Sequence, residues 1–286
     1  MSVHVEEIRL NLPHIELAAH LSGPEDGRPV IALHGWLDNA MTFARLTPKL
    51  EGLRIVALDF AGHGLSAHRA AGMDYLLCDY VMDVLLVAEQ LGWERFTLLG
   101  HSMGAIVSTL LAASMPERVE RLALIDGLVP FTADPAKGAQ NLSDALRAKL
   151  VLGRKRKPMY ENVERAVEAR MKSGAVSREA AELLAARGLM PVPGGYTWRT
   201  DARLTLPSAL RFTPGHARSF VDALQCPVNL VLAREGALGR STGMHELLDG
   251  RPFQVSELPG GHHLHLDDEA GAEAVAAVFR PFLLEN

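Results

Sequence analysis

The chain has 286 residues, of which 48% are hydrophobic and 22% charged, and its formal net charge is −5. This composition supplies a large core and excludes an intrinsically disordered chain. The mild negative charge gives no indication of nucleic-acid binding.

Targeting and redox signals are also few. The first seven residues lack the basic and apolar regions of a signal peptide, and no apolar run is long enough to cross a bilayer. The two cysteines, Cys78 and Cys226, lie far apart in apolar surroundings, which is typical of a reduced protein without disulfides. We therefore expect a cytoplasmic protein with no membrane span.

The predicted elements alternate between strands and helices after an N-terminal hairpin. Two short strands are predicted at 3–10 and 14–21, and apolar strands follow at 30–33, 54–58, 96–99, 119–125, 228–233 and 253–258. Helices are predicted near 40–50, 75–91 and 105–114, and from residue 268 onward. Strands that are apolar throughout are typical of a parallel sheet covered on both faces, so the pattern predicts an α/β fold.

The region between residues 131 and 225 differs from the rest of the chain. It carries two amphipathic helical patterns, at 160–172 and 177–187, and a Pro/Gly-rich bend at 190–195, but no clear buried strand. We interpret 131–225 as a helical lid inserted into one core, which is formed by residues 1–130 and 226–286.

The strand at 96–99 leads into Gly-His-Ser-Met-Gly at residues 100–104, which fits the pattern G-x-S-x-G. A serine on such a strand-to-helix turn is raised out of the sheet and lies at a helix N-terminus. Its neighbours two positions away must be small, and Gly100 and Gly104 are. The context predicts that Ser102 is a nucleophile.

A serine nucleophile needs a base, and His262 fits the position best among the 12 histidines. It follows a strand and a Pro-Gly-Gly turn, and it lies C-terminal to Ser102 as the order Ser, acid, His requires. His263 and His265 are close competitors. A metal site at this cluster is disfavoured because no carboxylate or thiolate accompanies it at a standard spacing.

The acid that orients the base is left open between two residues. Asp126 follows the strand ending at Ile125, and Glu235 follows the strand ending at Ala233. Both lie between Ser102 and His262, and we prefer Asp126.

Two backbone N–H groups are expected to bind the oxyanion that forms during acyl transfer. Met103 supplies one, and Trp36, in the loop after the first buried strand, supplies the other. His101 is expected to line the substrate pocket. Trp198 could wall that pocket or belong to the core of the lid.

Taken together, these motifs resemble those of α/β-hydrolase fold proteins. The resemblance rests on four stretches, namely His34-Gly35-Trp36, Asp59 with Gly62-His63-Gly64-x-Ser66, the Ser102 pentapeptide and Pro259-Gly260-Gly261-His262. Residues 34–39 and 194–199, with Asp201 and Arg203, are similar to the serine hydrolase-like subgroup. The resemblance implies an eight-stranded, mostly parallel sheet with helices on both faces, a helical lid and hydrolysis without a cofactor or metal. It also implies the roles given above to Ser102, His262, Trp36 and Met103.

One position departs from that family. Many members carry Asp where this chain has Gly236, so either Glu235 substitutes for it or the acid has moved to Asp126. Serine at position 102 argues against the dehalogenases and epoxide hydrolases of this fold, which use aspartate there.

The leading hypothesis is a hydrolase that cleaves a small carboxylic ester or related acyl substrate through an acyl-enzyme on Ser102. The same site would also suit thioester, lactone or C–C bond hydrolysis. A protein that only binds a ligand on this scaffold is a third interpretation. The oligomeric state is not predicted.

Overall fold

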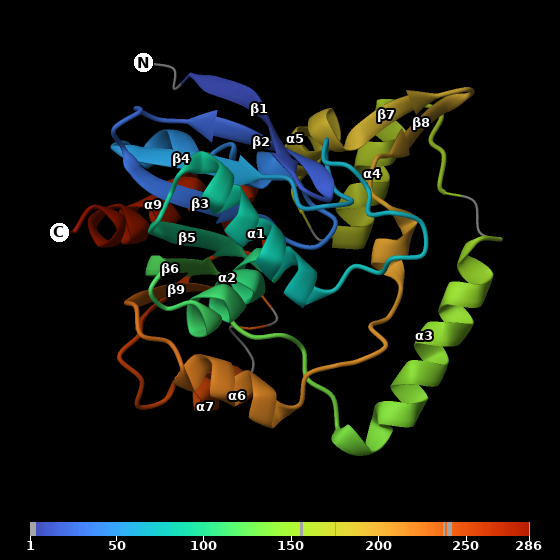
Figure 1. The fold of residues 1–286 in the computed structure, drawn as a ribbon. Coiled ribbons are helices and arrows are strands. Elements are labelled where there is room, and N and C mark those ends of the chain that lie inside the picture. The colour runs from blue at the N-terminus through green and yellow to red at the C-terminus, as the bar shows by residue number, and fades with distance from the viewer. Residues whose placement is uncertain (1–3, 155–156, 175, 237, 239–241, 286) are drawn as a thin grey trace.

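The computed structural model describes residues 4–154, 157–174, 176–236, 238 and 242–285. Its centre is an eight-stranded sheet with the order β1-β2-β4-β3-β5-β6-β9-β10 (Figure 1). The strands are β1 (Val5–Leu12), β2 (Ile15–Ser22), β3 (Arg28–Leu33), β4 (Leu53–Leu58), β5 (Phe96–His101), β6 (Val119–Ile125), β9 (Val228–Ala233) and β10 (Gln254–Leu258). The start of the first predicted strand, residue 3, lies outside the described residues.

The sheet is parallel except at its N-terminal edge. β2 pairs antiparallel with both β1 and β4, and the other neighbouring pairs of this sheet are parallel. This confirms the predicted mostly parallel eight-stranded sheet. Because parallel strands end at the same edge, the residues that follow β3, β5, β6 and β9 are brought together there, which is where sites of such sheets lie.

Alternate residues of each strand enter two separate cores, one on each face of the sheet. On β3, Ile31 and Leu33 pack in a cluster with α1 (Leu77–Leu91) and α2 (Met103–Ser114). Val30 and Ala32 pack in a second cluster that contains α9 (Glu269–Leu284). A strand buried on both faces must be apolar throughout, which explains the continuous apolar runs of the sequence.

The segment between β6 and β9, residues 131–225, is called the insertion below. It contains α3 (Gly138–Leu152), α4 (Val163–Gly174), α5 (Arg178–Gly188), α6 (Pro214–Asp222) and a small hairpin of β7 (Leu189–Val192) with β8 (Gly195–Trp198). The predicted bend at 190–195 therefore spans the turn of this hairpin and the adjoining ends of its two strands. Figure 1 shows α3 standing apart from the other helices, whereas α6 packs against α2.

Two shorter helices, α7 (Thr242–Leu248) and α8 (Leu264–Asp267), complete the core. The last predicted helix is α9, and the Asp268 carboxylate caps it by accepting the N–H of Gly271. No helix of the described ranges combines the length and the apolar character needed to cross a bilayer.

Candidate active site

Ser102 lies at the turn between β5 and α2, where the sequence predicts an elbow. Its φ of 52° and ψ of −114° are strained for a residue that carries a side chain. The Ser102 N–H donates to the carbonyl oxygen of Ile125 at 3.0 Å, and its own carbonyl accepts the N–H of Ile106 at 3.1 Å. The neighbouring strand and the helix therefore hold the serine in this conformation.

The glycines on either side of Ser102 leave no space for a side chain. A Cβ on Gly104 would lie 1.9 Å from the carbonyl oxygen of Leu33, and one on Gly100 would lie 2.5 Å from the Cα of Ala105. Both collisions involve backbone atoms, which cannot move without displacing a strand or a helix. The elbow therefore requires glycine at both positions.

His262 lies on the loop between β10 and α8, and its side chain is 36% exposed. Its Nδ1 lies 2.5 Å from Oδ2 of Asp126, which is fully buried directly after β6. A carboxylate that accepts a hydrogen bond from Nδ1–H keeps the proton on that nitrogen. The other ring nitrogen is then free to take a proton from a substrate or a nucleophile. The pair has the geometry of an oriented general base.

The same pair lies beside Ser102. A Cβ on Gly127 would lie 2.9 Å from the Cα of Ser102, so the segment carrying Asp126 runs along the elbow. From the other side, Nε2 of His101 donates to the carbonyl oxygen of His262 at 2.9 Å. The structure therefore brings Ser102, His262 and Asp126 to one edge of the sheet.

Glu235 lies in the same region but does not contact the base. Its carboxylate accepts the N–H of Gly260 at 2.5 Å, and its own N–H donates to the carbonyl oxygen of Gly260. Glu235 therefore holds the turn that precedes His262. A Cβ on Gly236 would lie 2.7 Å from Oδ2 of Asp126. Glycine at position 236 thus leaves the space that the Asp126 carboxylate occupies.

The turn after β3 carries Trp36, one of the predicted oxyanion donors. The N–H of Asp38 donates to the carbonyl oxygen of Gly35 at 3.2 Å, and the N–H of Leu37 donates to Nε2 of His63 at 3.2 Å. These bonds fix the backbone around Trp36. Its indole N–H donates to the carbonyl oxygen of Leu204 in the insertion, and its side chain is half exposed. Met103, the other predicted donor, is the first residue of α2, where N–H groups lack an intrahelical partner.

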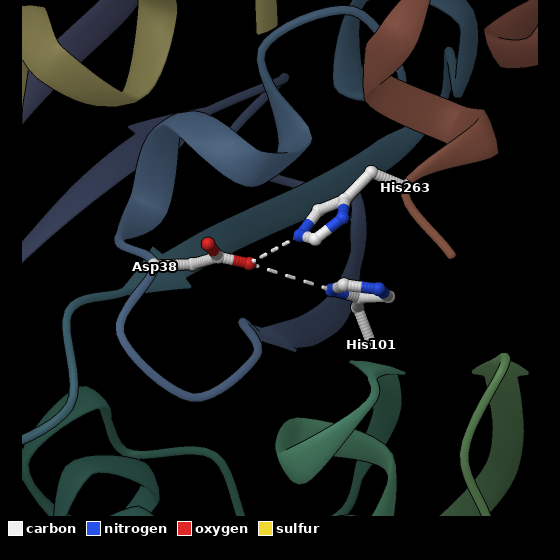
Figure 2. Close-up of side chains that lie close together, drawn as sticks. All are labelled: Asp38, His101 and His263. Atoms are coloured by element: carbon white, nitrogen blue, oxygen red, sulfur yellow. Dashed lines mark hydrogen bonds and ion pairs between the residues drawn. The ribbon is translucent and has the colours of Figure 1, made fainter. Parts of the chain in front are cut away.

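His101, which is expected to line the substrate pocket, lies among polar groups. His101 ends the central strand β5 and is fully buried, with Nδ1 3.8 Å from Oδ2 of Asp38. The same carboxylate oxygen accepts Nε2–H of His263 at 3.0 Å, as Figure 2 shows. His101 therefore lies beneath the His262 loop.

An arginine of the insertion balances the negative charge of Asp38 in this buried cluster. Arg170 of α4 donates to Oδ1 of Asp38 at 2.5 Å. Burial opposes ionisation of Asp38, but His263 and Arg170 hold the pKa of its carboxyl well below the ordinary range. Burial and the neighbouring His265 and His262 lower the pKa of His101 far below that of a free imidazole, so His101 is neutral.

Asp38 could not be associated with the histidines from the sequence, because it lies 225 residues from His263. Asp38, His101 and His263 bring their potential ligand atoms within 4.8 Å of one another, which a metal site would need. Their own contacts fit a different arrangement, since Arg170 already neutralises Asp38 and His263 donates to it. In the sequence, Asp38 is marked by its position in the stretch His34–Asn39, which is similar to the serine hydrolase-like subgroup.

Trp198 ends β8 and packs against the apolar cluster of the insertion, which also contains Leu184. A Cβ on Gly188 would lie 2.9 Å from the Trp198 ring. These contacts correspond to the second of the two roles considered for Trp198, that of a core residue of the insertion.

The chain is similar to known proteins in both sequence and fold. The sequence model of the family described as alpha/beta hydrolase fold matches residues 28–166. A serine hydrolase-like protein from Danio rerio is 32% identical over 97% of this chain and 88% of its own length. The chain belongs to the α/β-hydrolase superfamily.

Solved structures extend the likeness. A hypothetical protein from Pseudomonas aeruginosa PAO1 is 70% identical, with a TM-score of 0.96 over 97% of this chain and 99% of that one. The thioesterase domain from the curacin biosynthetic pathway is 25% identical, with a TM-score of 0.84 over 96% of this chain and 99% of that one. The serine hydrolase-like relative and the thioesterase domain support a hydrolase.

Proposed function

We propose that the protein is a serine hydrolase that cleaves a small carboxylic ester or related acyl compound through an acyl-enzyme on Ser102. The observation that carries the proposal is the 2.5 Å contact between His262 Nδ1 and Asp126 Oδ2, made beside the Ser102 elbow. Binding alone would not need an oriented base next to a strained serine.

The mechanism follows from these positions. His262 Nε2 takes the proton of Ser102 Oγ as the oxygen attacks the acyl carbonyl, and Asp126 stabilises the imidazolium that forms. The N–H groups of Met103 and Trp36 bind the oxyanion. His262 then protonates the leaving group, and a water molecule activated by the same histidine releases the acid. No cofactor takes part in these steps.

A thioester is the second candidate substrate. It is favoured by the likeness to the curacin thioesterase domain, which covers 96% of this chain. Ester and thioester cleavage use the same nucleophile, base and oxyanion donors, so the geometry supports both.

We further propose that the insertion, residues 131–225, is the lid over this site, and that residues 1–130 and 226–286 form the catalytic core. The contact between the Trp36 indole and Leu204 supports a lid that meets the oxyanion loop. A cytoplasmic location belongs to the same proposal, supported by the free thiols of Cys78 and Cys226.

The test compares wild type with Ser102→Ala, using p-nitrophenyl esters and acyl thioesters of several chain lengths and a fluorophosphonate probe. We expect wild type to hydrolyse some of these compounds and to be labelled at Ser102. Ser102→Ala should lose both properties. Turnover retained in Ser102→Ala, or labelling at another residue, would contradict the proposal. Tight retention of a ligand by an unlabelled wild type would favour a binding protein.

A further inference from the structure

Three segments that carry the proposed catalytic groups meet at one buried carboxylate, that of Asp38. Asp38 belongs to the turn that holds Trp36, His101 precedes Ser102, and His263 follows His262. The side chain of Asp38 is 1% exposed, and those of His101 and His263 are 0% and 6% exposed. Figure 2 shows the two imidazoles directed at the same carboxylate oxygen.

A fourth segment reaches the same carboxylate from the insertion. The Arg170 guanidinium, on α4, donates to Oδ1 of Asp38, while the histidines lie at Oδ2. Asp38 therefore joins the insertion to the core through its two oxygens.

Two glycines make room for this arrangement. A Cβ on Gly35 would lie 3.0 Å from Asp38 Oδ2 and 3.1 Å from His101 Nδ1. A Cβ on Gly174 would lie 1.6 Å from Nη1 of Arg170. The chain thus lacks side chains at the places where Asp38, His101 and Arg170 need space.

The insertion also contacts the short helix that follows His262. The N–H and hydroxyl of Ser177 donate to Oδ1 and the carbonyl oxygen of Asp267, at 2.7 and 2.8 Å. Leu266 of α8 packs in the apolar cluster of α4 and α5. Any displacement of these two helices therefore acts on the loop that carries the base.

We propose that Asp38 is a positioning residue for His262, and that Arg170 makes this positioning depend on the seating of the insertion. The chain of contacts runs from Arg170 to Asp38 and from Asp38 to His263, which is the neighbour of His262 in the chain. His101 packs against the same carboxylate, with Nδ1 3.8 Å from Oδ2, and its Nε2–H donates to the carbonyl oxygen of His262. This inference rests on the proposed function, because it assigns a position to the proposed base.

The test uses Asp38→Asn and Arg170→Met, each with a matched control. Asp83→Asn removes another carboxylate of 1% exposure. Asp83 lies on α1 and pairs with Arg69. Arg165→Met removes an exposed arginine from α4, the helix that carries Arg170. The measurements are kcat and KM with the best substrate, the rate of fluorophosphonate labelling of Ser102, and the thermal midpoint, all on the complete chain.

We expect Asp38→Asn and Arg170→Met to lower kcat and the labelling rate about 10- to 100-fold with KM little changed, because misplacing a catalytic group costs rate rather than binding. The double variant should lose no more than Asp38→Asn alone, since the two residues act through one contact. Asp83→Asn should lower the thermal midpoint without changing kcat, and Arg165→Met should change neither.

Unchanged kcat in either folded variant, or losses that add in the double variant, would overturn the proposal. Arg170→Met keeps it falsifiable if Asp38→Asn does not fold. Zinc ions that inhibit wild type but not Asp38→Asn would overturn it in favour of a metal site. An unlabelled and inactive wild type would remove the proposed function together with this inference, whereas a labelled wild type with a fully active Asp38→Asn would overturn this inference alone.

Discussion

Strained backbone is concentrated at the candidate site. Among the described residues, the non-glycine residues with positive φ are Leu37 at 64°, Ser102 at 52° and Asp126 at 42°. Each lies just beyond the end of a parallel strand, β3, β5 or β6. Such conformations persist where the surroundings impose them, and they recur at catalytic sites. The strain therefore falls on the segments that we propose as the oxyanion turn, the nucleophile and the acid.

The two candidate acids can be separated by conservative substitutions. Asp126→Asn should lower kcat by about 10⁴-fold, because an amide cannot hold the base in the tautomer that accepts the serine proton. Glu235→Gln should retain near wild-type kcat, since its amide oxygen can still accept the N–H of Gly260. Both are measured by steady-state kinetics on folded protein, and full activity in Asp126→Asn would contradict the assignment of the acid.

Ser102 and His262 could be proposed from the sequence because their signals are local. One is a pentapeptide between a strand and a helix, and the other is a turn after a strand. The sequence could not decide the acid, because β6 and β9 are neighbours with Ile125 level with Val231. Asp126 and Glu235 therefore emerge at the same edge, and only side-chain direction separates them. Asp38 and Arg170, 132 residues apart, meet through tertiary packing that no local pattern encodes.

At the scale of elements, the long periodic segments were the most predictable. The predicted helices near 75–91 and 105–114 are α1 and α2. The helix expected near 40–50 is instead two short 3₁₀ helices, at Ala40–Phe43 and Thr47–Lys49. Pro48 lies within the second and cannot donate the bond that a continuing α-helix needs. The missing N–H of Pro48 therefore outweighs the sequence pattern that favours a helix over 40–50.

Helix α5 provides a test of how the insertion is attached. Its Arg187 is buried, and Nε donates to both oxygens of Asp59, which directly follows β4. Arg187→Met should lower the free energy of unfolding by about 3–5 kcal/mol, because it leaves Asp59 buried without its cation. The measurement is denaturant unfolding of the purified variant.

Arg178→Met on the same helix is the control for Arg187→Met. Arg178 pairs with Glu164 on the surface with its side chain 47% exposed, so its loss should leave the free energy of unfolding close to that of wild type. Equal effects of the two substitutions would show that the pair with Asp59 does not anchor the insertion.

At the scale of the whole molecule, four buried histidines lie around the edge of the sheet that carries the candidate site. His34, His63, His101 and His265 have no exposed surface, and burial lowers the pKa of each, to about 3 for His63 and His265. Two of them already serve the backbone, since His34 Nε2 accepts the N–H of Phe60 and His63 Nε2 accepts that of Leu37. Protonation would break these bonds, so the native state holds His34 and His63 uncharged.

The stability of the protein should therefore fall on the acid side. Above the unfolded pKa of about 6.5 these four groups are neutral in both states and contribute no pH dependence. Below it the unfolded chain binds protons that the folded chain does not, and each such proton costs about 1.4 kcal/mol per pH unit until the folded pKa is reached. We expect the urea midpoint to decline steadily between about pH 7 and pH 5.

A matched pair of variants tests whether the buried histidines cause the pH dependence of the unfolding free energy. Within the described part of the chain, neither ring nitrogen of His265 has a hydrogen-bond partner, so His265→Phe removes a titrating group without breaking a bond. His265→Phe should reduce the slope of the unfolding free energy against pH by the contribution of one proton, about 1.4 kcal/mol per pH unit. His4→Gln, at an exposed position, is the control and should leave the slope unchanged. A urea midpoint that stays flat from neutral pH to about pH 5 would mean that the buried histidines accept protons while folded. The cluster beneath His262 would then be open to water, and rigid positioning of the base through His101 would fail with it.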